Sequence, residues 1–335
     1  MRLRVREMEP EDIEICASLV LTHPEERRRY GALSANLPSA WAKLLPTGSL
    51  NTTILESSNA GAFETAAVGV SAFIDEKLLR ELKTVPRAWI GPTLTQRVRD
   101  MSGSILDAGQ IREGNSNSGL NLAIWTGVVS PFSIDPMMDL ELFRGFFDRH
   151  LGYQIKEIIC QPPSVEQICA TFRAGLFWLS EAGEYIDGRL QPAGTILEEP
   201  FLIGGDREAA TRTFGSWFSG LLLAHNQVRL YLRPAEQRLL LAALRGLTDE
   251  ELAAELGIPL SAVKKTWREI YLRTGNHWNG CVPEGKAEDG NGKRGREKKQ
   301  HLLSYLRAHM EELRPVLPPI GAPVTSGLIR ESRLR

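Results

Sequence analysis

Hydrophobic positions in the C-terminal third repeat with the period of α-helices. From Pro234 onward, leucines and alanines recur every three to four residues until Gly246, which predicts a first helix with one apolar face. A Thr-Asp-Glu-Glu sequence then starts at Thr248 and is typical of a capping box, in which Thr248 and Glu251 satisfy backbone amides of the first helical turn. Gly257 predicts the end of this second helix, because glycine adopts a left-handed conformation at low cost.

The next stretch predicts a third helix with one apolar and one polar face. Its apolar positions follow helical spacing and are Val263, Trp267 and Ile270. The opposite face then presents Ser261, Lys264, Lys265 and Arg268. In a helix-turn-helix, such a face enters the major groove of DNA, where Lys and Arg donate hydrogen bonds to guanine edges and phosphates. The alternative interpretation is an ordinary solvated basic face on a three-helix bundle.

Residues 232 to 273 resemble the helix-turn-helix of LuxR/GerE-type transcription regulators. The positions that match this family's pattern are Leu232, Glu236, Leu239, Leu240, Gly246, Thr248, Glu251, Leu252, Ala253, Leu256, Ile258 and Val263. The resemblance implies that Lys264, Lys265 and Arg268 meet bases and phosphates, and that Thr248 approaches a phosphate. The departures from the pattern are Arg233, Pro259, Ala262 and Thr266. They weaken the predicted contacts with the DNA backbone and leave a sigma-factor region-four helix-turn-helix open as a related interpretation.

The N-terminal two thirds of the chain alternate between strand and helix patterns. Strands are predicted near 3–5 and at 51–55, 65–74, 120–129 and 154–160. Helices are predicted at 13–20, 75–84, 97–106 and 135–151 and from 164 onward, and the polar residues 112–119 predict a loop. The whole chain is therefore predicted to be α+β, with a mixed α/β N-terminal domain followed by an all-α helix-turn-helix domain.

The opening strand and helix, RLRVREMEPEDIEICASLV, resemble the first element of GNAT-type N-acetyltransferases. Enzymes of that family bind the coenzyme pyrophosphate through backbone amides of a [QR]-x-x-G-x-[GA] loop between a strand and a helix. The nearest match runs from Arg212 to Trp217, follows helix-like sequence and has an indole where a small residue is needed. We therefore predict a GNAT-like or sensor fold with no catalytic residues and no cofactor, and hence no enzymatic activity.

Other candidate chemistry is sparse in the sequence. His277, Cys281 and His301 are too few to supply the four ligands of a zinc site, so no metal is predicted. Cys160 and Cys169 are expected in the core. An aromatic set is expected to fill the core or, in part, to line a pocket for a small ligand; it consists of Trp125, Phe143, Phe146, Phe147, Phe172, Phe177 and Trp178.

Composition predicts a cellular compartment and shows an uneven distribution of charge along the chain. The chain has 335 residues, of which 42% are hydrophobic and 24% charged, and this is typical of a globular protein with two domains. Four cysteines without a CxxC pair and the lack of a leader predict a cytoplasmic protein, and no apolar run is long enough to span a membrane. Residues 1–228 carry seven more acidic than basic side chains, whereas 229–335 carry six more basic than acidic ones. A basic C-terminal third suits a phosphate partner.

We predict four segments along the chain. They are a GNAT-like or sensor domain at 1–205, a helical linker at 206–228, a DNA-binding domain at 229–314 and a loosely ordered tail at 315–335. A Gly-rich basic insertion at 275–296 interrupts the DNA-binding domain. The helix after it carries Leu302, Leu306, Met310 and Leu313 on one side. This apolar stripe is expected either to close the domain or to pair in a homodimer.

The predicted function is that of a transcription regulator which binds double-stranded DNA and senses a small-molecule effector or a partner through its N-terminal domain. A GNAT-type N-acetyltransferase with an appended DNA-binding segment is the alternative. A scaffold whose three-helix unit binds another protein is a third possibility, and it would bind without the salt dependence of a phosphate contact.

Overall fold

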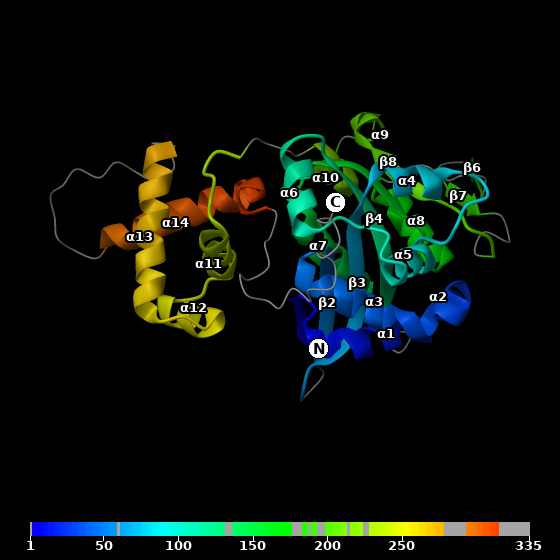
Figure 1. Ribbon diagram of the computed structural model, residues 1–335, viewed down its shortest axis with the longest axis horizontal. Coiled ribbons are helices and arrows are strands. Elements are labelled where there is room, and N and C mark those ends of the chain that lie inside the picture. Colours follow the sequence, from blue (N-terminus) through cyan, green and yellow to red (C-terminus); the bar gives the residue numbers. More distant parts are fainter. Residues whose placement is uncertain are drawn as a thin grey trace, which may run out of the picture. The chain divides into compact units, whose positions relative to one another are not determined.

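The computed structural model describes residues 2–58, 61–130, 136–175, 183–186, 189–192, 198–212, 215–223, 228–277 and 293–314. The chain divides into an α/β unit that ends at Ala224 and a helical unit that begins at His225. Figure 1 shows the elements of both units. Among the described residues, every helix is too short or too polar to cross a membrane.

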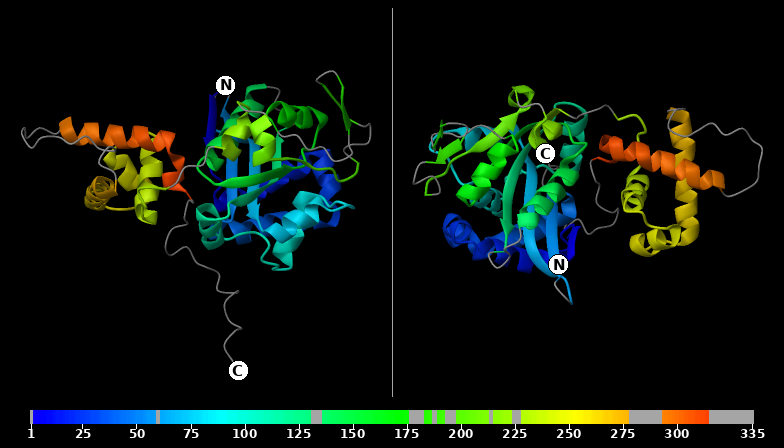
Figure 2. Two further views of the ribbon diagram at one scale, coloured as in Figure 1. Left: turned by 90° about the horizontal axis from the view of Figure 1, so that it is seen from above. Right: turned by 180° about the vertical axis from the view of Figure 1, so that it is seen from behind.

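A six-stranded mixed sheet forms the centre of the α/β unit, with helices on both of its faces (Figure 2). Its strands, in spatial order, are β1 (Arg2–Arg6), β2 (Leu50–Ser58), β3 (Glu64–Ile74), β4 (Leu120–Val129), β5 (Ile155–Cys160) and β8 (Ile203–Asp206). All neighbours are antiparallel except β4 and β5, which run parallel. A separate hairpin consists of β6 (Gly183–Ile186) and β7 (Arg189–Pro192). The mixed α/β prediction for this part of the chain is confirmed.

Alternating residues of the strands pack into hydrophobic clusters on both faces of the sheet, as the two-residue period of a strand requires. One face packs against α1 (Ile13–Thr22), α3 (Leu37–Leu44), α4 (Glu76–Lys83) and α5 (Ile90–Arg99). Helix α2 (Pro24–Tyr30) joins this layer through the buried Tyr30. The other face packs against α6 (Ala108–Ser116), α7 (Pro136–His150), α8 (Val165–Arg173) and α10 (Trp217–Leu223).

Three segments of this unit differ from the sequence prediction. The stretch 112–119, expected as a loop, is helical up to Ser116, because α6 begins at an Asp107 capping box and buries Ile111; residues 117–119 lie outside the helix. The helix expected at 97–106 lies earlier in the chain, as α5. Residues 206–228, expected as a helical linker, do contain α9 (Arg207–Arg212) and α10, but α10 packs into the core of the unit. Phe218 and Leu222 of α10 are buried in the same cluster as β5. The unit therefore extends through α10, because these side chains complete its core.

The helical unit consists of α11 (Pro234–Leu244), α12 (Asp249–Leu256), α13 (Leu260–His277), α14 (Lys293–Ala308) and the 3₁₀ turn η4 (Met310–Leu313). The predicted capping box is present: the amide of Thr248 donates to Glu251 at 2.7 Å, and the amide of Glu251 donates to the Thr248 hydroxyl at 3.2 Å. Gly257 ends α12 with a φ of +62°. Val263, Trp267 and Ile270 are buried, as predicted.

The apolar stripe of α14 closes the helical unit itself. Leu302, Leu306 and Leu313 are fully buried in the same cluster as α11 and α13. The Asp249 carboxylate, at the start of α12, accepts from the Trp267 indole at 3.2 Å and from the Lys299 ammonium at 2.9 Å. Of the predicted basic insertion, residues 278–292 lie outside the described part of the chain, as does the tail from 315 onward.

Candidate active site

The parallel strands β4 and β5 separate part of the way along their length. They pair only from Leu120 to Ala123 on β4 and from Ile155 to Ile159 on β5, and beyond this point β4 pairs with β3 alone. Two local features account for the separation. The β3–β4 register skips Trp125, and the resulting bulge bends β4. Pro162 and Pro163 follow β5, and proline cannot donate to a further ladder.

A cavity of about 200 Å³ lies where the strands separate. Residues 124–127 of β4 form one wall, and residues 160–163 at the end of β5 form the other. Helices α7 and α8 and the Phe218 ring of α10 complete the lining. Much of that lining is aromatic, and the Phe143 and Phe218 rings meet edge to face with centroids 5.4 Å apart. The cavity therefore suits a ligand with an apolar body.

Among the described residues, every charged side chain that lines the cavity is acidic. They come from three helices and are Glu26 of α2, Asp139 of α7 and Glu166 of α8. Glu26 is only 4% exposed, and burial raises the pKa of its carboxyl, although the cation of Arg29 opposes this rise. Partial burial also raises the pKa of Asp139. An apolar cavity with carboxylates at its wall attracts a cation.

Thr126 contributes a hydroxyl to the same cavity. The residue is 5% exposed, and its Oγ1 atom has no hydrogen-bond partner among the described residues. It lies opposite Val70, directly after the bulge at Trp125. A buried hydroxyl without a partner costs free energy, so a ligand that hydrogen-bonds to Thr126 would recover that cost.

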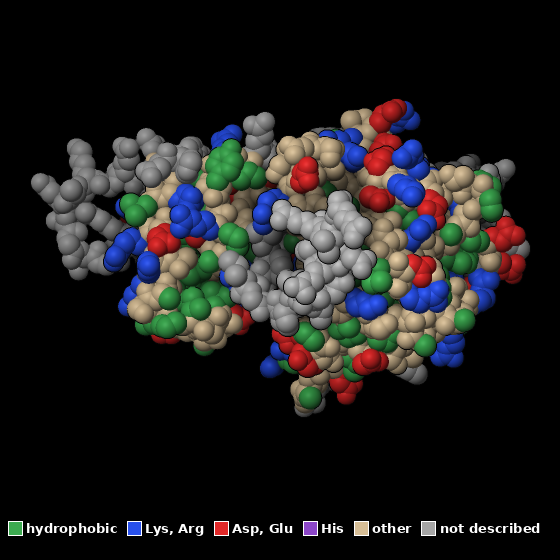
Figure 3. Space-filling model, in the orientation of Figure 1, with side chains coloured by type: hydrophobic (Ala, Val, Ile, Leu, Met, Phe, Trp, Pro, Cys, Tyr) green, Lys and Arg blue, Asp and Glu red, His purple; other side chains and the backbone are tan. Residues whose placement is uncertain are grey.

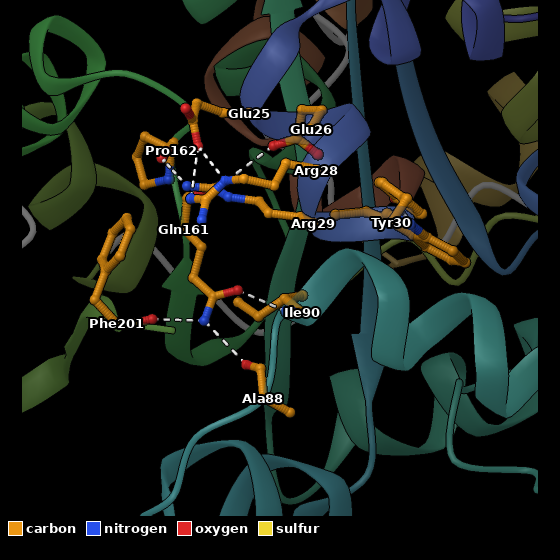
Figure 4. A network of polar contacts seen from close by, with 11 residues as sticks. Glu25, Glu26, Arg28, Arg29, Tyr30, Ala88, Ile90, Gln161, Pro162 and Phe201 are labelled. Atoms are coloured by element: carbon orange, nitrogen blue, oxygen red, sulfur yellow. Dashed lines mark hydrogen bonds and ion pairs between the residues drawn. The ribbon is translucent and has the colours of Figure 1, made fainter. Parts of the chain in front are cut away.

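A network of polar contacts fixes the β5 wall of the cavity (Figure 4). The Arg29 guanidinium donates to the Glu26 carboxylate at 2.9 Å and to the backbone carbonyls of Gln161 and Pro162 at 2.7 and 2.9 Å. The Gln161 side chain accepts from the amide of Ile90 at 2.6 Å and donates to the Phe201 carbonyl at 2.5 Å. This network supplies partners for carbonyls that the sheet no longer pairs.

Two further buried groups shape the cavity without reacting in it. The Trp125 indole donates to the Tyr30 hydroxyl at 2.9 Å, and full burial raises the pKa of Tyr30, which keeps the phenol neutral. Burial raises the pKa of Cys160 to about 12. Its thiol is therefore protonated at neutral pH, and Cys160 is a poor nucleophile.

The residues predicted to contact DNA all lie in the helical unit. Ser261, Lys264, Lys265 and Arg268 are exposed on α13, and the exposed Thr248 caps α12 with its hydroxyl. Figure 3 shows lysine and arginine side chains on the visible face of this unit, among hydrophobic ones. The structure places these residues as the helical spacing predicted, but their contact with DNA stays a prediction.

Sequence reasoning missed the residues that surround the cavity. Glu26 and Arg29 stand in the sequence PEERRR, which contains no recognisable chemical motif. Their spacing of three residues is the one signal that could have paired them on a helix. Trp125, Phe143 and Phe146 do line the cavity, in keeping with the pocket interpretation of the aromatic set. Phe177 and Trp178 lie outside the described residues.

Comparisons with known proteins found similar chains among solved structures of acetyltransferases. No family model matches it, and neither does any curated protein. An agmatine N-acetyltransferase in its apo form is 16% identical and has a TM-score of 0.37, with 60% of this chain and 97% of that chain covered. A Drosophila melanogaster polyamine N-acetyltransferase is 15% identical, covers 61% of this chain and 100% of its own, and has a TM-score of 0.35. An aminoglycoside acetyltransferase in complex with coenzyme A is 13% identical, with coverage of 63% and 99% and a TM-score of 0.33.

These comparisons correct the main functional prediction. The similar solved structures are in keeping with the GNAT-like expectation for the α/β unit, and they give no support to a LuxR/GerE-type domain. The predicted DNA-binding regulator without enzymatic activity is therefore not retained, since the structures named here are those of N-acetyltransferases. A capped helix pair with a basic face is a local pattern that a helical bundle produces whatever its function.

Proposed function

We propose that the protein transfers an acyl group from a thioester to an amine bound in the cavity between β4 and β5, with Glu26 as the general base. The observation that carries the proposal is the buried carboxylate of Glu26 at the wall of an apolar cavity whose other charged lining residues are also acidic. Agmatine and polyamines, the compounds named for two of the similar structures, are cations and agree with this charge.

The chemistry requires a base because an amine is an ammonium ion near neutral pH. Carboxylates hold the ammonium, and Glu26 accepts one of its protons. The free amine nitrogen then attacks the thioester carbonyl carbon, a C–N bond forms, and the C–S bond breaks. The nitrogen loses its second proton to the thiolate that leaves, and Glu26 releases the first proton to solvent, which balances the reaction. A carboxyl whose pKa is raised toward neutrality is a stronger base than an ordinary glutamate.

Thr126 has a separate part in this proposal. Its free hydroxyl donates a hydrogen bond to an oxygen of the bound acyl group or acceptor. The aromatic rings of Phe143, Phe146 and Phe218 exclude water from the reacting atoms. Each of these contributions comes from a residue that lines the same cavity.

Steady-state kinetics test the proposal. The protein is mixed with acetyl-CoA and either agmatine or 2-phenylethylamine, and released thiol is measured. We expect thiol release that depends on the amine and falls strongly in Glu26→Gln. Glu25→Gln is the matched control, because Glu25 lies on the same helix but pairs with the exposed Arg28. Absence of amine-dependent thiol release, or full activity of Glu26→Gln, would remove the proposal.

A further inference from the structure

The residue Arg29 connects the proposed base with the wall of the cavity. Its side chain is 2% exposed, and that of Glu26 is 5% exposed. The guanidinium carbon lies 4.2 Å from the centre of the Trp89 ring and 5.7 Å from that of the Phe201 ring. These aromatic faces, together with the carbonyls of Gln161 and Pro162, hold the cation in one position.

We propose that Arg29 is a positioning residue, which aims the Glu26 carboxylate into the cavity and sets the pH at which Glu26 accepts a proton. The inference rests on the proposed function. Arg29 and Glu26 are one helical turn apart, and the guanidinium meets the carboxylate at 2.9 Å. The same guanidinium donates to the backbone carbonyls of Gln161 and Pro162 in the β5 wall, so the Glu26 carboxylate and this wall keep a constant separation.

The charges around Glu26 decide the direction of the effect. Burial raises the pKa of Glu26, the Arg29 cation lowers it, and Glu25 raises it slightly. His23 adds little positive charge, because burial and the nearby Arg29 lower its pKa. The titratable groups near Glu26 at the start and on the length of α2 are His23, Glu25, Arg29 and Tyr30, and those that share the cavity lining with it are Asp139 and Glu166. Arg29 is the member of this set that favours the ionised carboxylate at neutral pH.

The first test is the pH profile of kcat/KM for acetyl transfer to agmatine. Arg29→Met removes the opposing cation, so the acid limb should move to higher pH by about one unit or more. Arg29→Lys keeps a charge and should move the limb less. Arg28→Met is the matched control on the same helix, and it should leave the limb in place because Arg28 pairs with Glu25. A lower kcat with an unmoved limb in Arg29→Met would show a merely structural role and overturn the proposal.

The second test does not depend on activity. Carboxyl resonances are followed through a pH titration of the protein labelled with ¹³C at the glutamate side chains, and Glu26→Gln identifies the resonance of Glu26. The pKa of Glu26 should rise in Arg29→Met and stay constant in Arg28→Met. A rise without any acetyl transfer would refute the proposed function and keep the Arg29–Glu26 coupling, whereas transfer without a rise would refute the coupling alone.

Folding of the variants gives a third result. If Arg29→Met does not fold, the double variant Glu26→Gln/Arg29→Met distinguishes the two causes. Recovery of the folded protein in the double variant would show that the uncompensated Glu26 charge was responsible, in support of the coupling. Failure of the double variant as well would assign Arg29 to the wall carbonyls only and overturn its role through Glu26.

Discussion

Both units of the protein bury a glutamate, but the two carboxylates differ in how many hydrogen-bond donors they already have. Glu312 in the helical unit is 1% exposed and accepts from the amide of Leu230 at 2.9 Å, the amide of Arg229 at 3.0 Å and the Tyr305 hydroxyl at 2.9 Å. Glu26 in the α/β unit has Arg29 as its hydrogen-bonding partner among the described residues, and it lines a cavity.

The difference separates a structural carboxylate from one suited to chemistry. The contacts of Glu312 join η4 to the chain that leads into α11, so that the end of the helical unit is tied to its beginning. Glu236 of α11 is similar, since it is 1% exposed and accepts from Arg273 at 3.0 Å and from the amide of Arg233 at 2.6 Å. Burial of a carboxylate alone therefore does not indicate an active site. A buried carboxylate indicates a candidate active site when it can still accept hydrogen bonds and lines a cavity.

The largest effect on activity is expected when the Glu26 carboxylate is replaced. Glu26→Gln should lower kcat/KM for acetyl transfer about 10²- to 10⁴-fold, because a general base contributes about that much. In the unchanged protein, activity should fall as the pH drops through the raised pKa of Glu26, since the protonated acid cannot act as a base. Kinetics between pH 5 and 9 measure both, and hydrogen–deuterium exchange should show an unchanged fold. A loss of protection of the α2 amides from exchange would show that Glu26 has a structural role and would contradict its distinction from Glu312.

For Glu312, whose carboxylate already has its hydrogen-bond donors, a loss of stability without a loss of activity is expected. Glu312→Leu leaves the amides of Arg229 and Leu230 without their acceptor and should destabilise the helical unit by about 3 kcal/mol. Urea unfolding followed by hydrogen exchange at α11 and α14 measures the loss. Acetyl transfer should stay at its original rate, and the exposed Glu250→Gln serves as the control. If Glu312→Leu lost as much acetyl transfer as Glu26→Gln, the contrast between the two glutamates would be wrong.

A smaller effect should accompany loss of the free hydroxyl of Thr126. Thr126→Val removes a buried group without a partner, so the free energy of unfolding should stay constant or rise by up to about 1 kcal/mol. The same variant should lose about tenfold in kcat/KM, because a ligand hydrogen bond is worth about 1 kcal/mol or more. Thr126→Ser should restore the rate. Thermal unfolding and kinetics together check the prediction, and a destabilised, fully active Thr126→Val protein would disprove it.

The smallest effect concerns the capping box at the start of α12. Thr248→Ala removes the hydroxyl that accepts from the Glu251 amide, and the unit should lose about 1 kcal/mol of stability. Ser261→Ala, on the exposed face of α13, should change stability by less. Urea unfolding of the two variants measures the difference. Equal stability of both would show that the capping box contributes nothing.

Much of the fold followed from local sequence. The cap at Thr248, the stop at Gly257 and the buried face of α13 depend on residues within one or two turns of each other. Helix α6 was missed because Ile111 and Asn115 are its only buried residues, which leaves almost no hydrophobic period to detect. The extension of the α/β unit through α10 was missed because the burial of Phe218 depends on contact with a distant strand.

The candidate site could be predicted only in part. An aromatic pocket was among the interpretations of the sequence, but neither Glu26 nor Thr126 was expected in it. The sequence lacks the coenzyme motif and gives no sign of the cavity. The basic face of α13 has a clear helical spacing, but that spacing does not establish a chemistry.

By itself, the sequence determined the mixed α/β and helical segments of this protein and the faces that its helices bury, because these follow from periods of two and of 3.6 residues. Only the tertiary structure decided where chemistry can occur. The separation of β4 from β5 brings residues 26, 126, 139 and 166 to one cavity. Glu26 lies 100 to 140 positions from the other three residues, and side chains so far apart share no period, so their meeting and the raised pKa that burial gives Glu26 exist only in the folded chain.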